Sequence, residues 1–289
     1  MRSTGLAGLT VRKSRVALSL LAVGVSGAAL VAQAPGSGAD GSMAPSSATT
    51  QSLFPAPNQF LYVRSRGAYL TCKFEARARA CWMQPRRLRE VWVSERREGL
   101  LVERPAGVLR RPSALGPRRI YLGNRRFTHR AMATYAPTGA QLLAELQEGR
   151  APGQGSGGAS YPYVQLTDAL REAAMPAKVR QAIIDALALV PGVAQLGKRS
   201  DALGRPGIGF ARTLPDAREE VIVDPASLVM LEERTILLKA SAAPGAGKRV
   251  GEPIGGALYL ARAVVDRAGQ RPSQDRASTR ERSRSREGR

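Results

Sequence analysis

The chain has 289 residues, with 44 Lys or Arg against 23 Asp or Glu and a net charge of +21 at pH 7. Residues 73–130 hold 16 basic and five acidic residues, a net +11, in segments that are typical of strands and loops and not of a recognition helix. This distribution argues against a nucleic-acid partner. With two cysteines and one histidine, the chain also has too few ligands for a Cys/His metal site, and we expect no cofactor.

The first residues have the pattern of an export segment. Basic residues up to Arg15 precede an apolar run at 16–34, which is near the minimum length of roughly 17–25 residues for a membrane-spanning helix. Small residues spaced for a signal peptidase leave cleavage as the alternative. We therefore predict a signal anchor or signal peptide at 1–34 and a flexible spacer at 35–53. The rest of the chain is then extracytoplasmic, either in a single-pass protein of the cell membrane or in a secreted one.

Folded structure is expected to begin near Phe54. An alternating aromatic pattern at 60–65 predicts a strand, and further strands are expected at 88–93 and 100–103. Prolines and glycines in turn positions indicate loop structure at 104–119.

The middle of the chain carries helix signals. Thr138 and Gln141 form a capping box, in which each side chain binds the free backbone N–H of the other residue, and a leucine stripe follows. Further helices are expected at 164–174 and from Pro176 to the residue before Pro191.

After Val193 the pattern predicts strands again, at 195–200, 208–213, 218–224, 229–238 and 257–265. The order of strands, helices and strands predicts an α+β domain at 54–265, in which two or three helices cover one antiparallel sheet or half-barrel. The basic segment 266–289 has few apolar residues and is expected to be a disordered tail.

Cys72 and Cys81 are the only cysteines, nine positions apart across an expected hairpin. An extracytoplasmic location permits oxidation, so a disulfide is favoured over a metal pair or two free thiols. Such a bridge would contribute roughly 2–3 kcal/mol.

Two groups of side chains are candidates for binding. An anion-binding face is the first hypothesis, with a solvated arginine coat as its alternative; its residues are Arg86, Arg87, Arg96 and Arg97. An apolar groove is the second, with ordinary core packing as its alternative; its residues are Phe60, Tyr62, Trp82 and Trp92.

His129 is the only imidazole available to a nucleophile–base triad, and it lies among arginines in a chain without a Gly-x-Ser-x-Gly elbow. The glutamate pairs at 219–220 and 232–233 each place at most one carboxylate on the inner face of a strand. No residue set specifies a reaction, and we expect a protein that is not an enzyme.

Several motifs occur together in a fixed order: FLYVRSR at 60–66, REVWVS at 89–94, ALALVPGV at 186–193, GRPG at 204–207, and DP at 224–225 before LEERT at 231–235. In this combination the chain resembles a family of uncharacterised, membrane-anchored actinobacterial proteins often encoded beside extracytoplasmic-function sigma factors. More distantly it is similar to the lipoprotein-carrier and anti-sigma-regulator half-barrels, which hold acyl chains or peptides. The resemblance covers most of 55–240 and implies no catalytic residues. The Arg-rich segment 104–119 and the basic tail depart from the family pattern.

Taken together, these patterns predict a non-enzymatic extracytoplasmic binding or sensor module on a membrane anchor, linked to envelope signalling. The expected partners are an anionic membrane surface, an envelope lipid or wall component, or another exported or membrane protein. An envelope hydrolase that uses His129 and a structural surface protein are the alternatives.

Overall fold

The computed structural model describes residues 53–272, apart from 76–77, 106–110, 124, 149–159, 173 and 243–245. The predicted anchor or signal at 1–34, nearly all of the spacer and residues 273–289 of the tail lie outside the described residues. Within the described part of the chain, no helix is both long and apolar enough to cross a membrane.

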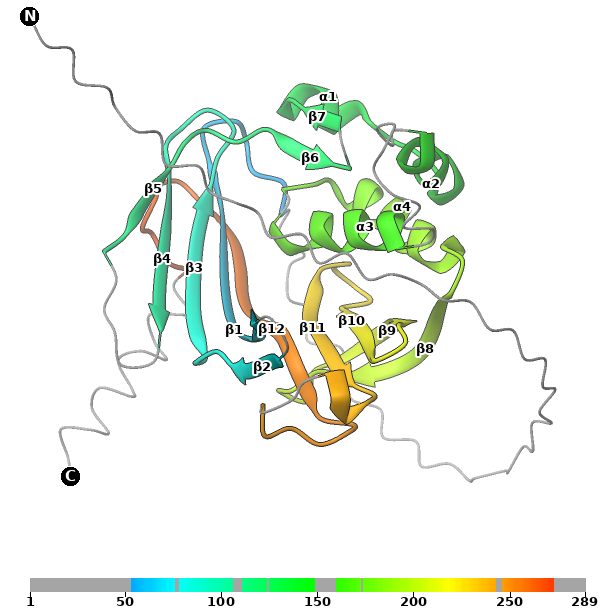
Figure 1. Cartoon of the computed structure of the whole chain (residues 1–289). Coiled ribbons are helices and arrows are strands. Elements are labelled where there is room, and N and C mark those ends of the chain that lie inside the picture. The colour runs from blue at the N-terminus through cyan, green and yellow to red at the C-terminus, as the bar shows by residue number, and fades with distance from the viewer. Residues whose placement is uncertain are drawn as a thin grey trace, which may run out of the picture. The chain divides into compact units, whose positions relative to one another are not determined.

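One open, antiparallel sheet of ten strands forms the body of the domain (Figure 1). Its order is β5-β4-β3-β1-β12-β11-β10-β9-β8, and β2 pairs with β1 off this path. The N-terminal strands are β1 (Phe60–Glu75), β2 (Ala78–Met83), β3 (Arg87–Val93), β4 (Gly99–Pro105) and β5 (Ser113–Leu115). The C-terminal strands are β8 (Val193–Ser200), β9 (Pro206–Thr213), β10 (Ala217–Val223), β11 (Met230–Leu237) and β12 (Pro253–Val265). The first and last strands, β1 and β12, are neighbours and join two meanders into one sheet.

Four helices lie on one side of this sheet (Figure 1). They are α1 (His129–Thr134), α2 (Gly139–Glu148), α3 (Ser160–Glu172) and α4 (Ala177–Leu189), and α2 and α3 both pack on α4. A small ribbon of β6 (Ile120–Leu122) and β7 (Arg125–Phe127) precedes them, and one short 3-10 turn (Ala240–Ala242) precedes β12. The predicted α+β class, with helices over an open antiparallel half-barrel, is confirmed.

The helix boundaries follow local capping chemistry. In the predicted capping box, the backbone N–H of Thr138 donates to Gln141 Oε1 at 2.9 Å, and that of Gln141 donates to Thr138 Oγ1 at 3.2 Å. Helix α3 begins at Ser160, four residues before the predicted start. Helix α1 was not predicted, because its six residues are too few to show a period; its one signal is Thr128, whose Oγ1 accepts from the N–H of Ala131.

Strand alternation gives the sheet two apolar faces. On the helix side, Leu61, Val63 and Val91 belong to a large core that contains the buried stripe of α4. That stripe consists of Val179, Ile183, Leu187 and Val190. On the opposite side, a second cluster contains Phe60, Tyr62, Trp92, Ala263 and Val265.

The second cluster is partly covered by the chain just after β12. The indole Nε1 of Trp92 donates to the carbonyl of Gln270 at 2.6 Å. The guanidinium of Arg271 donates twice to the carboxylate of Glu90, at 2.6 and 2.7 Å. The contacts of the domain thus extend past Val265, the predicted boundary, because a buried carboxylate and a buried indole N–H need partners.

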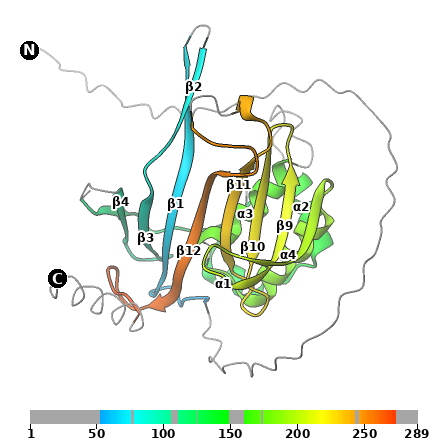
Figure 2. The ribbon, with the colours of Figure 1, turned by 90° about the horizontal axis from the view of Figure 1, so that it is seen from below.

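The far end of β1 forms an arm with β2 that extends beyond the neighbouring strands (Figure 2). Residues 60–69 of β1 pair with β12, whereas residues 70–75 pair with β2. Cys72 and Cys81 stand directly opposite each other in this arm and form a disulfide with an S–S distance of 2.13 Å. The predicted disulfide is confirmed.

Candidate functional site

A cavity of about 380 Å³ lies between α3 and the end of β3. Four segments supply most of its walls: residues 54–57 before β1, 93–95 at the end of β3, 118–121 at β6 and 165–174 at the end of α3. This volume is in the range of small-molecule sites, about 300–1,000 Å³. The site therefore has the size of a ligand pocket and is built from parts that are distant in the sequence.

The walls of this cavity are largely apolar. Pro57, Val93, Ile120 and Ala169 contribute aliphatic surface. The ring of Phe54 stacks on that of His129, with centroids 4.2 Å apart and planes 5° apart. Apolar walls with a stacked aromatic pair favour a ligand that has an apolar body.

Two of the three acidic groups around the cavity are paired with arginines. Glu172 binds Arg89 and lies 3.7 Å from Arg118, and Asp168 lies 2.5 Å from Arg171. Burial raises the pKa of Asp168 above its ordinary value, against the lowering effect of Arg171. The remaining acid, Glu95, accepts a hydrogen bond from the backbone of His129.

The mouth of the cavity carries exposed cations. Arg118 and Arg119 both lie at the surface where β6 begins. Arg119 has no hydrogen bond or ion pair with any residue in the described part of the chain. Since Asp168 and Glu172 are paired, these two arginines offer positive charge to an incoming group.

Behind α3, a buried glutamate fixes the helix to the sheet. Glu233 on β11 accepts from Arg171 Nε at 2.7 Å, from the Tyr259 hydroxyl at 3.3 Å and from the Tyr69 hydroxyl at 3.4 Å. Burial and the Glu233 carboxylate raise the pKa of Tyr69 to about 12. A smaller cavity of about 100 Å³ lies beside this network, and Arg171 lines both cavities. The network holds α3 at a fixed place over the sheet.

The cavity also brings Ser94 and His129 together, the residue types of a hydrolase. The Ser94 hydroxyl donates to the carbonyl of Pro57 at 3.2 Å, and among the described residues no hydrogen bond joins it to His129. In the same part of the chain, no group of three or more His, Cys, Asp or Glu is placed to hold a metal ion. The arrangement provides surface for binding and no assembled nucleophile–base pair.

The four arginines predicted to bind anions lie in two separate places. Arg86 and Arg87 lie where β3 begins, and Arg96 and Arg97 lie in the turn after β3 ends. A seven-residue strand spans roughly 20 Å, so the two pairs are at opposite ends of it. Arg97 also donates to the carbonyls of Asn58 and Asp266, at 3.3 and 2.9 Å. The structure does not bring the four together in one patch.

The four aromatic residues of the predicted groove do not share a groove either. Phe60, Tyr62 and Trp92 are at most 1% exposed and belong to the cluster on the sheet face away from the helices. Trp82 is 45% exposed and lies on the β1–β2 arm. Phe60, Tyr62 and Trp92 are therefore ordinary core residues, which was the alternative to a groove. They are buried because β1 and β3 carry apolar side chains on both faces of the sheet.

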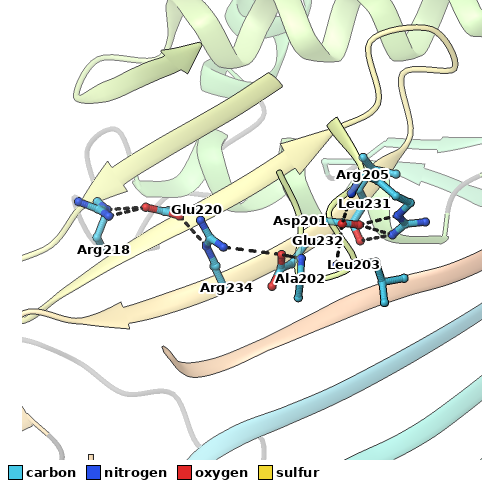
Figure 3. A network of polar contacts seen from close by, with 9 residues as sticks. All are labelled: Asp201, Ala202, Leu203, Arg205, Arg218, Glu220, Leu231, Glu232 and Arg234. Atoms are coloured by element: carbon cyan, nitrogen blue, oxygen red, sulfur yellow. Dashed lines mark hydrogen bonds and ion pairs between the residues drawn. The ribbon is translucent and has the colours of Figure 1, made fainter. Parts of the chain in front are cut away.

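On the C-terminal strands, the sheet face away from the helices carries a chain of ion pairs (Figure 3). Glu220 on β10 lies 2.6 Å from both Arg218 and Arg234, and Arg234 lies 3.7 Å from Glu232. Glu232 accepts from the N–H of Ala202 in the β8–β9 turn. These charges are compensated within the sheet and leave no open site there.

No family model matches the chain, and no curated protein matches it. The solved structures to which the chain is distantly similar include the MucA/MucB complex of Pseudomonas aeruginosa, at 12% identity and a TM-score of 0.30, over 74% of this chain and 54% of that one. A crystal structure of MucB matches at 14% identity and a TM-score of 0.23, over 78% of this chain and 58% of the MucB chain. A LolA superfamily protein from Nitrosomonas europaea matches at 8% identity and a TM-score of 0.21, over 78% of this chain and 93% of that protein. The distant similarity expected from the sequence is thus found, and the chain spans little more than half the length of the MucB chains.

Proposed function

We propose that this protein is a non-enzymatic extracytoplasmic binding module, and that its ligand is a small amphipathic molecule held in the cavity beside α3. One observation carries the proposal: a 380 Å³ cavity with largely apolar walls, in which two of the three acids are paired with arginines and Arg119 lies exposed at the mouth. Such a site fits a molecule with an apolar body and an acidic head. Among the partners expected from the sequence, an envelope lipid or its acyl fragment has this chemistry.

The acidic head would lie against Arg118 and Arg119, and the apolar body would lie along Phe54, Val93 and Ala169. A guanidinium suits a carboxylate or phosphate, because its planar N–H groups match two oxygens at once. The apolar body would contribute about 25 cal/mol for each Å² of surface it buries.

A fluorescent fatty acid, dansyl-undecanoic acid, tests the proposal with purified full-length protein. Gln165 lines the cavity from α3 and is only partly buried, so Gln165→Trp should fill space without disturbing the core. We expect this change to weaken probe binding at least tenfold. The matched control is Gln147→Trp on the exposed side of α2, which should bind as the wild type does. Equal binding by both variants, or no binding by the wild type, would reject the cavity as the ligand site.

We further propose that the module is held at the membrane by residues 1–34 and acts in envelope signalling, together with another exported or membrane protein. The export pattern of the first residues and the family resemblance support this proposal. A cysteine at position 47 of the spacer should react with a membrane-impermeant maleimide on intact cells. Labelling only after lysis would place the domain inside the cell and refute the topology.

A further inference from the structure

Two arginines line a small void between the helix layer and the sheet. Arg180 comes from α4 and is 8% exposed, whereas Arg262 comes from β12 and is half-buried, with its Nε shielded from solvent. The void has a volume of about 10 Å³, which is about the size that holds one water-sized particle. The other residues that line it are apolar: Leu53, Leu61, Ala169, Leu170 and Val229.

The polar contacts of both arginines go to backbone carbonyls. Arg180 donates to the carbonyls of Met175 and, at 3.0 Å, of Ser227. Arg262 donates to the carbonyl of Arg171 at 2.7 Å and to that of Met230 at 3.4 Å. Its guanidinium carbon lies 4.6 Å from the centre of the Tyr259 ring. Its Nε is buried and has no hydrogen-bond partner in the described part of the chain.

No carboxylate of the described residues forms an ion pair with either arginine. The two nearby acids are engaged elsewhere, Glu172 with Arg89 and Arg118, and Glu233 with Arg171. Burial lowers the pKa of Arg180, and it lowers that of Arg262 to about 10. Both side chains are cations at neutral pH, because the guanidinium keeps its proton in proteins. Buried charges are costly unless they are paired, and an arginine cannot escape the cost by losing its proton.

We infer that the void between Arg180 and Arg262 binds one small inorganic anion of the size of chloride, which bridges the two guanidinium groups. The side chains that line the void offer N–H donors and no acceptors. A halide only accepts hydrogen bonds and suits such a site, whereas the two hydrogens of a water molecule would find no side-chain acceptor there. Phosphate and carboxylates are too large for the space. The anion would join α4 to β12 and so fasten the helix layer to the sheet.

Thermal unfolding of the full-length protein in sodium chloride and in sodium gluconate, at equal ionic strength, tests this inference. Gluconate is too bulky for the void, so only chloride should raise the melting temperature through the site. We expect a rise of roughly 3–5 °C for each tenfold increase in chloride above its Kd. Arg262→Gln should remove the difference between the two salts. Arg130→Gln, at an exposed arginine on α1, should keep it.

If Arg262→Gln fails to fold, crystals of the wild type grown in sodium bromide decide the question by anomalous scattering. A bromide peak within hydrogen-bond distance of Arg262 Nε and of the Arg180 guanidinium supports the site. Equal melting temperatures of the wild type in the two salts, or a void that holds only water in bromide crystals, overturns the inference.

Discussion

Two buried glutamates on the sheet face away from the helices are held by arginines in different ways. Glu220 on β10 is 2% exposed, and its partners Arg218 and Arg234 are two and 14 positions away. Glu90 on β3 is 1% exposed, and its closest partner, Arg271, is 181 positions away. The C-terminal meander therefore compensates its own charge, whereas the N-terminal meander is completed only when the end of the domain folds back over it.

The environment of Glu90 shows what this contact does. Burial raises the pKa of Glu90, but hydrogen bonds from Arg271 and from the Tyr62 hydroxyl outweigh burial and hold the pKa below its ordinary value. The second arginine near Glu90, Arg104, is 3.5 Å away and 41% exposed. Arg271 is thus the main compensation for a charge that is out of reach of water.

The largest expected effect comes from breaking the long-range pair. Arg271→Met leaves Glu90 buried without its bidentate partner and should lower the free energy of unfolding by about 3–5 kcal/mol. Chemical denaturation of the full-length protein measures this loss. Arg267→Met is the matched control, because Arg267 is an exposed arginine of the same segment. If both variants unfolded like the wild type, the segment after β12 would not complete the domain.

Breaking one of the local pairs should cost less. In Arg234→Met, Glu220 keeps Arg218 at 2.6 Å, so we expect a loss of about 1–2 kcal/mol in the same measurement. The double variant Arg218→Met/Arg234→Met should lose more than the sum of the single variants, because only then is the carboxylate left unpaired. Additive losses would mean that the two arginines act independently of Glu220.

The pH dependence of stability separates the charge of Glu90 from its packing. Because the folded pKa is lowered, the stabilisation by its carboxylate is present above the unfolded pKa of about 4.3 and is lost as the pH falls through the folded pKa. Glu90→Gln should therefore be less stable than the wild type at pH 7, and the gap should shrink as the pH falls below the unfolded pKa. A gap that is constant over this range would assign the effect to packing.

The smallest effects on stability are expected from the arginines at the two ends of β3. Arg86→Gln/Arg87→Gln should change the free energy of unfolding by less than about 0.5 kcal/mol. It should nevertheless weaken binding to phosphatidylglycerol vesicles several-fold at low salt, because each arginine near an anionic surface contributes about 1 kcal/mol. Arg96→Gln/Arg97→Gln should weaken that binding less, because Arg97 is already held by the carbonyls of Asn58 and Asp266 and by the ring of Phe60. If vesicle binding changed neither with salt nor in either double variant, these arginines would be only a solvated surface coat.

The sequence was sufficient for the features that depend on neighbouring residues. The alternation at 60–65, the capping box of Thr138 and Gln141, and the strand pattern after Val193 predict the elements and their order, because each rests on contacts within a few positions. The disulfide of Cys72 and Cys81 could also be predicted from nearby residues, since the hairpin that pairs them is local. The α+β class followed from that order of elements.

The tertiary structure alone decided which surfaces are buried and what covers them. Both faces of β1 and β3 are apolar, so alternation could not say that Tyr62 and Trp92 lie in the core opposite the helices. The ligand cavity, the void between Arg180 and Arg262, and the pair of Glu90 with Arg271 each join segments that are far apart in the chain. Local patterns record the preferences of short segments, whereas burial and charge compensation depend on which distant segments meet, and folding of the whole sheet determines that.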